Sequence, residues 1–427
     1  MATNVTCGGK GFARKRFNKD CFGRYQIIRT LFTEYIEQMR SWFKIYKSSQ
    51  LCFIIREWNY LRENYTTDVF RAHLRYTGKA STNGHINSTS VIVKCTHEGG
   101  LLESLAREIN LFDKELDMFS TILPKMNKLH QRLGSFSACC LKYIEKPLQT
   151  LLLEDLCPMG YTIHERRFGL DLEHTQAILR ILAGFHATSY IMLEEDPNIL
   201  KDIYESGLFP DKEVCTGWIS TGYVAFKDAI NRWPEFEKYR DRLTISESVF
   251  IRRCLDTMSK KEGDFIVLNH GDMWINNMMF AYSEDGRIKD TKLIDYQLSI
   301  KCSPAVDLHY FFSTSLADEL RSEIDYLLDY YYGHLLVAFT ELGHDLSSIP
   351  TREQFLNDFK KRAYYGILGL VTVLPLVRSQ NREDASFEDL FFNDKPTGFR
   401  YHAFNNEQYK KGVLNILPYY DTLGILE

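Results

Sequence analysis

Two short apolar stretches, each followed by an aspartate, constrain the fold of this chain more than any other feature of its sequence. Residues 267–272 read VLNHGD, and residues 293–295 read LID. Residues 278–282 and 292–295 lie on either side of the turn-rich sequence SEDG, which is the pattern of a β-hairpin. The sequence therefore predicts an apolar strand that ends in a loop carrying Asp272, and a hairpin whose second strand ends at Asp295.

The polar residues of these loops have a spacing that suits phosphoryl transfer. Asn277 follows Asp272 by five residues, so that residues 270–277 have the H-x-D-x-x-x-x-N pattern of kinase catalytic loops, with Asp295 as the later acidic residue. In that chemistry one carboxylate faces the acceptor hydroxyl, while an amide and a second carboxylate hold Mg²⁺. We therefore expect Asp272 to orient the hydroxyl and accept its proton, and Asn277 and Asp295 to bind the metal.

Four further residues are expected to bind ATP. Lys94 ends the apolar sequence VIVK, and Glu115 lies in the helical segment that follows. A strand lysine paired with a helix glutamate positions the α- and β-phosphates in kinases. The sequence LLLEDL at 151–156 has the pattern of an interlobe linker, which would bind adenine through the carbonyl of Glu154 and the amide of Leu156.

Two other polar residues are expected to support the catalytic loop. His270 is predicted to hold the backbone of the loop rather than to transfer protons. Asp307 lies in the sequence PAVDL, which is typical of a helix start, and its carboxylate is predicted to accept hydrogen bonds from the catalytic loop.

The order of the predicted elements indicates an α+β chain with two lobes. Residues 51–95 have short β-like segments, 101–123 are helical up to Pro124, and strands are predicted at 136–143 and 151–154. After 156 the pattern is mainly helical, apart from the hairpin described above. This is the order of a protein-kinase-like two-lobed fold, with a β-rich N-lobe that contains one long helix and a large, mainly helical C-lobe. The predicted parts are an N-terminal tail and helix at 1–50, an N-lobe with its hinge at 51–156, and a C-lobe at 157–427 that carries the catalytic loop and the acceptor site.

Composition excludes several classes of protein. A net charge of −4 and a pI of about 6.3 argue against nucleic acid as the main partner. The ten cysteines include no C-x-x-C pair, which favours reduced thiols in a cytoplasmic protein. The longest apolar run, 364–377, contains Pro375 and is too short to span a membrane. Nothing in the sequence indicates an obligate protein partner.

Taken together, these motifs resemble the arthropod ecdysteroid kinase-like (CHK kinase-like) family, which is related to choline kinases and aminoglycoside phosphotransferases. The resemblance runs from about residue 64 to the C-terminus. It is carried by segments that match the family in order: IVK at 92–94, the helix before ILP at 122–124, LEDL at 153–156, LAGFHATS at 182–189, HGDMWINN at 270–277, IDYQ at 294–297, PAVDL at 304–308 and LPYYD at 417–421.

The resemblance implies an enzyme that uses ATP and Mg²⁺ to phosphorylate a small-molecule alcohol, such as an ecdysteroid or a lipophilic xenobiotic. It also implies a phosphate-binding loop at Asn64, Tyr65, Thr66 and Thr67. One position departs from the family pattern, because Arg62 stands where the family has glycine. A side chain at that position opposes close approach of the backbone to a phosphate.

Three alternatives bear on this interpretation. A pseudokinase that binds small molecules without phosphoryl transfer is favoured by Arg62 and opposed by the intact set of polar residues named above. A binuclear metallophosphatase needs further spaced histidine and aspartate ligands, which the sequence does not show. A protein kinase needs an activation segment after Asp295, where the chain instead leads almost directly to Pro304. The sequence does not identify the acceptor alcohol, the oligomeric state or the role of residues 1–50.

Overall fold

The chain divides into two compact units. The computed structural model describes residues 51–57, 67–77, 86–96, 106–130, 135–145, 148–207, 213–243, 245–380, 382, 385, 387–393 and 397–426. Unit 1 comprises Met1–Glu103 and Ala138–Gly160, and unit 2 comprises Ser104–Ser137 and Tyr161–Glu427. The helical segment that follows Lys94 in the sequence is therefore grouped with the mainly helical unit 2.

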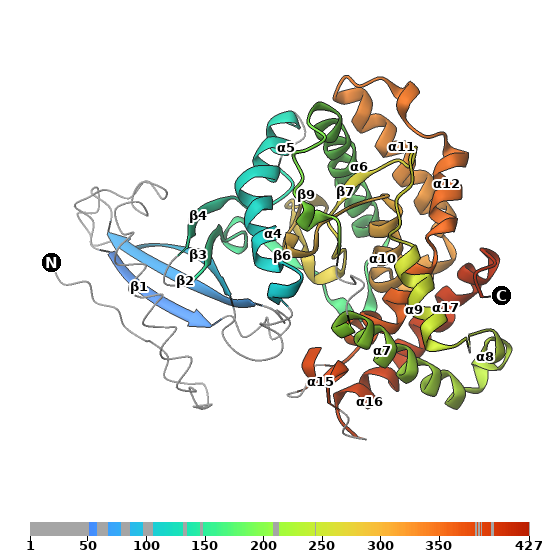
Figure 1. Cartoon of the computed structure of the whole chain (residues 1–427). Coiled ribbons are helices and arrows are strands. Elements are labelled where there is room, and N and C mark those ends of the chain that lie inside the picture. Colours follow the sequence, from blue (N-terminus) through green and yellow to red (C-terminus); the bar gives the residue numbers. More distant parts are fainter. Residues whose placement is uncertain are drawn as a thin grey trace. The chain divides into compact units, whose positions relative to one another are not determined.

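Unit 1 is built on a five-stranded antiparallel sheet with the order β1-β2-β3-β5-β4. Its strands are β1 (Leu51–Glu57), β2 (Thr67–Thr77), β3 (Ile86–Thr96), β4 (Cys140–Ile144) and β5 (Thr150–Glu154). Figure 1 labels four of these strands, β1, β2, β3 and β4. All residues of β5 except the last are buried, as is expected for a strand with a neighbour on each side. The sequence predicted β5 closely, whereas β4 begins four residues later than expected.

Unit 2 contains two small sheets. Strands β6 (Tyr161–Ile163), β8 (Met278–Tyr282) and β9 (Ile288–Leu293) form one of them, with β8 in the middle. The β8–β9 pair is the hairpin predicted from the sequence. The second sheet pairs β7 (Val267–Asn269) with β10 (Ile300–Cys302) in antiparallel register. Strands β6 and β10 were not predicted, because each has only three residues and, unlike β7, does not lead into a recognised motif.

The rest of unit 2 is mainly helical. The longer helices are α6 (Leu172–Glu195), α7 (Glu213–Arg232), α9 (Glu247–Asp256), α10 (Ala305–Ser315), α11 (Ile324–Glu341), α12 (Arg352–Lys361), α13 (Tyr364–Thr372) and α17 (Glu407–Thr422). The shorter ones are α4 (Leu111–Asp117), α5 (Leu123–Leu129), α8 (Glu237–Leu243), α14 (Leu374–Val377), α15 (Phe387–Phe391) and α16 (Phe399–Phe404). Helices α6 and α11 pack side by side (Figure 1).

Helix α10 forms the centre of unit 2, since every one of its residues is buried. It packs against α13, where the backbone of the two helices comes close. A Cβ atom on Gly369 would lie 2.3 Å from the Oγ of Ser313. Glycine at position 369 therefore permits the close packing of α13 against α10 in the core. Because α10 begins just after β10, the same contact also fixes the region next to the predicted catalytic loop.

The helix expected to stop at Pro124 continues past it. After α4, residues Met118–Ile122 form a π-helical turn, and Pro124 lies in the first turn of α5. Proline has no N–H to donate to the preceding turn. The first turn of a new helix tolerates this loss, and the π-turn provides the change of register that starts the new helix.

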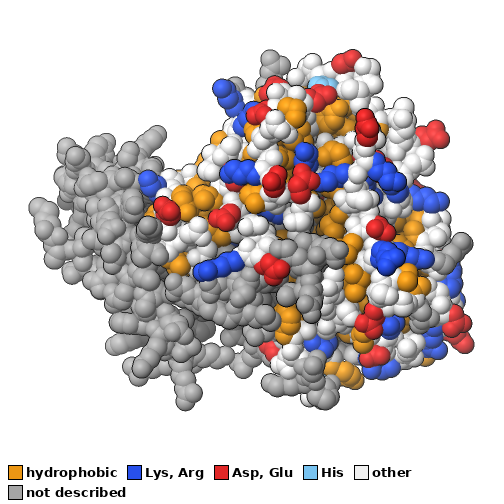
Figure 2. Space-filling view, in the orientation of Figure 1, with side chains coloured by type: hydrophobic (Ala, Val, Ile, Leu, Met, Phe, Trp, Pro, Cys, Tyr) orange, Lys and Arg blue, Asp and Glu red, His pale blue; other side chains and the backbone are white. Residues whose placement is uncertain are grey.

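Charged side chains of both signs are interspersed over the described face of unit 2 that Figure 2 shows, with apolar side chains between them. Among the described residues, no helix is both long enough and apolar enough to cross a membrane. The apolar run 364–377 forms α13 and α14, and both helices are largely buried.

Candidate active site

Strand β7 lies in the interior of unit 2 and leads directly into the predicted catalytic loop. Its three residues are fully buried, and Asn269 pairs with Ile300 of β10. The chain then turns at Gly271, whose φ is +82°. A Cβ atom there would lie 2.0 Å from the carbonyl oxygen of Leu298. Glycine is therefore required twice at this position, for its backbone conformation and for the close approach of the two loops.

Asp307, in the first turn of α10, holds the backbone of this loop. One of its carboxylate oxygens accepts a hydrogen bond from the His270 amide at 2.7 Å, and the other accepts one from the Gly271 amide at 2.8 Å. His186 of α6 contacts the same carboxylate at 3.1 Å and also contacts the hydroxyl of Tyr331 at 2.7 Å. The predicted contact between Asp307 and the catalytic loop is thus present, in a fully buried cluster.

His270 connects this loop to the segment before Asp295. Its Nε2 lies 3.0 Å from the carbonyl oxygen of Ile294, and its Nδ1 accepts a hydrogen bond from the amide of Asp272 at 3.3 Å. A ring that donates from one nitrogen and accepts at the other is neutral. Burial lowers the pKa of His270 and favours the same neutral form, against the opposing charges of Asp307 and Asp295. The ring therefore holds the backbone of its own loop, as predicted, and also joins that loop to the segment before Asp295.

The side chain of Asp272 is held at both carboxylate oxygens. Asn277 donates through Nδ2 to Oδ2 at 2.9 Å and to the Asp272 carbonyl at 3.0 Å. Tyr310 of α10 donates to Oδ1 at 2.6 Å. Because both of these Asn277 bonds use its nitrogen, the acceptor oxygen Oδ1 is the atom that can serve as a metal ligand. Tyr310 is a site residue that the sequence analysis missed, since a tyrosine inside an apolar helix has no distinguishing signal.

Asp295 lies beside Asn277 because of the β8–β9 hairpin. Met278 pairs with Leu293, and the amide of Ile294 donates to the carbonyl of Asn277 at 3.0 Å. Asp295 itself has φ 68° and ψ 68°, one of two described non-glycine residues with positive φ. A left-handed conformation is costly for a residue with a Cβ and is often found where a side chain must be aimed at a ligand. The hairpin therefore brings the chain segments that carry Asn277 and Asp295, one amide and one carboxylate, next to each other.

Glu115 is in the same unit as these loops. It is fully buried in α4, which packs against the one-turn 3₁₀ helix Tyr296–Leu298 that follows Asp295. The ring of Phe119 meets that of Tyr296 edge-on, with centroids 5.9 Å apart. Lys94 is in unit 1, on β3 opposite Leu151 of β5, and is 4% exposed. The pairing of Lys94 with Glu115 stays a prediction.

The other predicted nucleotide-binding residues belong to unit 1. The carboxylate of Glu154 accepts a hydrogen bond from the Cys139 amide at 3.3 Å, and Leu156 is buried at the end of β5. Thr67 is the first residue of β2. The rest of the predicted phosphate loop lies outside the described residues, namely Asn64, Tyr65 and Thr66, and so does Arg62.

A buried aspartate that the sequence analysis did not single out anchors the predicted hinge. Asp155 accepts hydrogen bonds from Ser90 at 2.6 Å and from Nη2 of Arg71 at 3.3 Å, and it forms an ion pair with the Nε of Arg71 at 2.7 Å. These contacts tie the end of β5 to β2 and β3, and so fix the direction in which the chain leaves the sheet.

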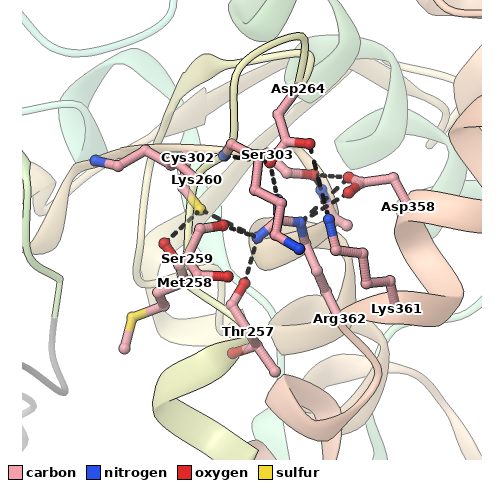
Figure 3. Close-up of polar contacts among 12 residues, drawn as sticks. Thr257, Met258, Ser259, Lys260, Asp264, Cys302, Ser303, Asp358, Lys361 and Arg362 are labelled. Carbon is pink, nitrogen blue, oxygen red and sulfur yellow. Dashed lines mark hydrogen bonds and ion pairs between the residues drawn. The ribbon is translucent and has the colours of Figure 1, made fainter.

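A second polar network, centred on the buried side chain of Arg362, holds the segment that leads into β7 (Figure 3). Arg362 contacts Asp358 at 3.0 Å and Asp264 at 3.1 Å, and it donates to the carbonyl oxygens of Thr257 and Ser259. Asp264 precedes β7 by three residues, so that this guanidinium holds the approach to the catalytic loop. Its fork of donors lets one side chain satisfy several acceptors at once.

The same network reaches the start of α10. The hydroxyl of Ser303 donates to Asp358, the residue that also binds Arg362 (Figure 3). Ser303 precedes α10 by two residues and its hydroxyl accepts from the amide of Ala305 at 3.1 Å. The network therefore connects two segments: the one that leads into β7 and the catalytic loop, and the one that leads into α10 and Asp307.

Structures of three small-molecule phosphotransferases resemble the chain, each at low identity. An ethanolamine kinase from Plasmodium vivax is 12% identical with a TM-score of 0.41, over 87% of this chain and 84% of its own. An aminoglycoside phosphotransferase from Alicyclobacillus acidocaldarius is 12% identical with a TM-score of 0.37, over 82% and 89%. The choline kinase LicA from Streptococcus pneumoniae is 13% identical with a TM-score of 0.37, over 81% and 90%. No curated protein matches the chain.

The sequence profile of the ecdysteroid kinase-like family matches residues 62–344. This segment is more than half of the chain and includes Asp272, Asn277 and Asp295. The predicted fold class, α+β and protein-kinase-like, is also confirmed by the antiparallel sheet of unit 1 and the helices and hairpin of unit 2. The chain therefore belongs to the ecdysteroid kinase-like family.

Proposed function

We propose that the chain is an ATP- and Mg²⁺-dependent O-phosphotransferase that acts on the hydroxyl of a small molecule, such as an ecdysteroid or a lipophilic xenobiotic alcohol. The observation that carries this proposal is the cluster of Asp272, Asn277 and Asp295 in unit 2. Asn277 donates its amide hydrogens to Asp272 and is bonded through its backbone to the residue before Asp295. Membership of the family supports the general class of the reaction, and the choice of alcohol is part of the proposal.

The donor set of the cluster fits magnesium. Asn277 offers an amide oxygen and Asp295 offers a carboxylate, and hard oxygen ligands are those that Mg²⁺ prefers. Bound there, the metal would neutralise charge on the β- and γ-phosphates of ATP. Asn277 and Asp295 are therefore the proposed metal ligands.

Asp272 is proposed as the residue that faces the acceptor. With both of its oxygens held, the carboxylate has a fixed orientation and can accept a hydrogen bond from an alcohol without reorganising. It would align the hydroxyl for attack and take its proton as the new O–P bond forms. The fixed orientation depends on Tyr310 and Asn277, one on each oxygen.

Residues of unit 1 are proposed to bind the nucleotide. Lys94, positioned by Glu115, would contact the phosphates, and the backbone of Glu154 and Leu156 would contact adenine. The loop of Asn64, Tyr65, Thr66 and Thr67 would cover the phosphates. The division into an N-terminal segment at 1–50, an N-lobe at 51–156 and a C-lobe at 157–427 belongs to the same proposal.

The experiment is an assay of γ-phosphate transfer from ATP to a panel of steroid and xenobiotic alcohols, with and without Mg²⁺. Wild type is expected to form a phosphate ester on at least one alcohol, and Asp272→Asn is expected to lower kcat about 10²–10⁴-fold. Asp285→Asn is a matched control, because this aspartate lies on the exposed turn of the β8–β9 hairpin. Equal rates for wild type and Asp272→Asn would refute the proposed role of Asp272.

A pseudokinase is the alternative function, and Arg62 in the predicted phosphate loop is the observation that favours it. It would bind small molecules without forming a phosphate ester on any of them. Saturable binding of an alcohol to wild type, with no Mg²⁺-dependent transfer to that alcohol, would establish this alternative. Replacement of Arg62 by the glycine of the family pattern would then test whether the arginine is the cause.

A further inference from the structure

A second group of potential metal ligands lies at the other end of strand β8. His164, Asp171 and His174 each offer one ligand atom, and these three atoms all lie within 4.8 Å of one another. His164 follows β6, Asp171 caps the N-terminus of α6, and His174 lies in the first turn of that helix. None of them belongs to the proposed phosphoryl-transfer site. They form one group in three dimensions because β6 pairs with β8, against which α6 begins.

The ring of His174 is oriented at both nitrogens. Nδ1 lies 2.7 Å from Oδ1 of Asp171, and Nε2 lies 2.9 Å from the hydroxyl of Tyr282, the last residue of β8. The ring also packs edge-on against Phe280, with centroids 4.8 Å apart. A metal-binding histidine usually donates its other N–H to a neighbouring acceptor, which fixes the ring and its tautomer. If Nε2 donates to the oxygen of Tyr282, the lone pair of Nδ1 is directed toward Asp171.

His164 has the complementary arrangement. Its Nδ1 lies 3.3 Å from the carbonyl oxygen of Glu165, which can accept the N–H and leave Nε2 as the ligand atom. Its ring meets that of His174 edge-on, with centroids 4.6 Å apart. A structural contact between Asp171, His174 and Tyr282 accounts for the positions of those three residues. It does not account for a second imidazole placed beside them.

Asp171 supplies a negative charge, and its exposed side chain lets a cation reach the group from solvent. Its side chain is 58% exposed, whereas that of His174 is 10% exposed. An aspartate carboxylate is ordinarily ionised at neutral pH and can serve as an anionic ligand. Its position at the positive end of α6 weakens cation binding somewhat, and for this reason we expect moderate rather than very tight affinity.

From this geometry we infer that His164, Asp171 and His174 form a binding site for a Zn²⁺-class divalent cation, with Tyr282 as the group that orients His174. Two imidazoles and one carboxylate are ligands that favour Zn²⁺ over Mg²⁺ or Ca²⁺. Three protein ligands leave a fourth position for water or an exogenous ligand. The cation would join β6, α6 and the end of β8, where Tyr282 follows Asn277 by five residues in the chain.

The test is a titration of the full-length, metal-stripped protein with Zn²⁺ by calorimetry, in millimolar Mg²⁺ and with the thiols kept reduced. Wild type is expected to bind one Zn²⁺ at this site. His164→Gln and Asp171→Asn are each expected to weaken the binding at least about 10-fold, and Tyr282→Phe about 10–100-fold. Asparagine is as good an N-cap as aspartate, so that Asp171→Asn keeps the start of α6 intact.

His344→Ala is the matched control. His344 also contacts a carboxylate, that of Glu194 at 2.5 Å, and a backbone carbonyl oxygen, that of Asp345 at 2.8 Å. It belongs to no group of three ligands among the described residues. This variant is expected to bind Zn²⁺ as wild type does. The same result for His164→Gln or Asp171→Asn would overturn the proposed site.

Replacement of Zn²⁺ by Co²⁺ identifies the ligands independently. Tetrahedral Co²⁺ with nitrogen and oxygen ligands is expected to give visible d–d absorption without the strong near-ultraviolet charge-transfer band of a thiolate. That visible spectrum should disappear in His164→Gln. A thiolate band instead, lost on replacing Cys139 and Cys140, would show that cysteines bind the metal and would overturn the proposal. So would the absence of any binding to wild type.

Discussion

Asp272 accepts hydrogen bonds from two side chains that reach it from different elements. Asn277 comes from its own loop, whereas Tyr310 comes from α10. The loop backbone is held separately by Asp307, which accepts from two consecutive amides. Position and orientation of the proposed base thus depend on different residues. A substitution at Tyr310 can therefore disturb its orientation while the loop keeps its place.

We predict that Tyr310→Phe lowers kcat about 10-fold or more and leaves KM for ATP nearly unchanged. The substitution removes one hydroxyl, and a hydrogen bond to a charged group contributes about 1.5–3 kcal/mol. Initial rates over a range of ATP concentrations measure both constants.

Tyr365→Phe is the matched control for this prediction. Tyr365 is also buried, its ring centroid lies 6.3 Å from that of Tyr310, and its hydroxyl has no hydrogen-bond partner among the described residues. Removal of that hydroxyl is expected to leave the rate unchanged, because no bond is lost. If the two variants have the same activity, the contact between Tyr310 and Asp272 has no catalytic role.

At the scale of elements, the turn after β7 has a stricter requirement than the turn of the hairpin. Gly271 and Gly286 both have φ of +82°, but only Gly271 has atoms within 4 Å of where a Cβ would be. We predict that Gly286→Ala destabilises the fold by about 1–2 kcal/mol, the cost of the left-handed conformation alone. Gly271→Ala should cost about 1–3 kcal/mol more, because the added methyl group overlaps the carbonyl oxygen of Leu298. Urea denaturation of both variants measures the difference, and equal losses of stability would contradict the prediction.

Helix α4, which carries Glu115, is attached to a segment of unit 2 before α7. Lys114 donates to the carbonyl oxygen of Ser206 at 2.7 Å, and Tyr204 donates to Asp117 at 3.1 Å. Burial of the ammonium group lowers the pKa of Lys114 from 10.5 to about 7. The folded state therefore binds this proton less tightly than the unfolded state does.

The pH dependence that follows can be measured with Lys114→Met. The unfavourable contribution of Lys114 is full below pH 7 and is relieved as pH rises from 7 toward 10.5. Across that window the unfolded state binds more protons, so that unfolding free energy rises with pH by about 1.4 kcal/mol per unit at most. Wild type should gain stability over this range relative to Lys114→Met in urea denaturation at successive pH values. A constant difference between the two proteins would show that the ammonium group is not desolvated in the fold.

Local patterns predicted the elements of the site, but not the contacts that complete it. Asp272, Asn277 and Asp295 could be found because each lies at a fixed distance from an apolar strand. Tyr310 could not be found, since in sequence it looks the same as Tyr365, a buried tyrosine without a polar partner. Only the tertiary position of α10 distinguishes the two. The same reason applies to Arg362, whose partners other than Asp358 come from segments about 60 and 100 residues away in the sequence.

At the scale of the whole molecule, the proposed ligands divide between the two units. Asp272, Asn277, Asp295 and Glu115 belong to unit 2, whereas Lys94 and the residues proposed to bind adenine belong to unit 1. Nucleotide binding should therefore depend on both units. The proposed Mg²⁺ ligands are complete within unit 2, and they can be tested separately from the residues proposed to contact adenine.

The most direct test of the central claim is the affinity for ATP with and without Mg²⁺, measured by calorimetry for wild type, Asp295→Asn and Asp272→Asn. We predict that Mg²⁺ strengthens ATP binding to wild type and to Asp272→Asn equally, since Asp272 is proposed to face the acceptor. Asp295→Asn should lose the effect of Mg²⁺ and keep the affinity for free ATP. If Mg²⁺ strengthens binding to Asp295→Asn as much as to wild type, or if wild type does not bind ATP, the proposed magnesium site is wrong.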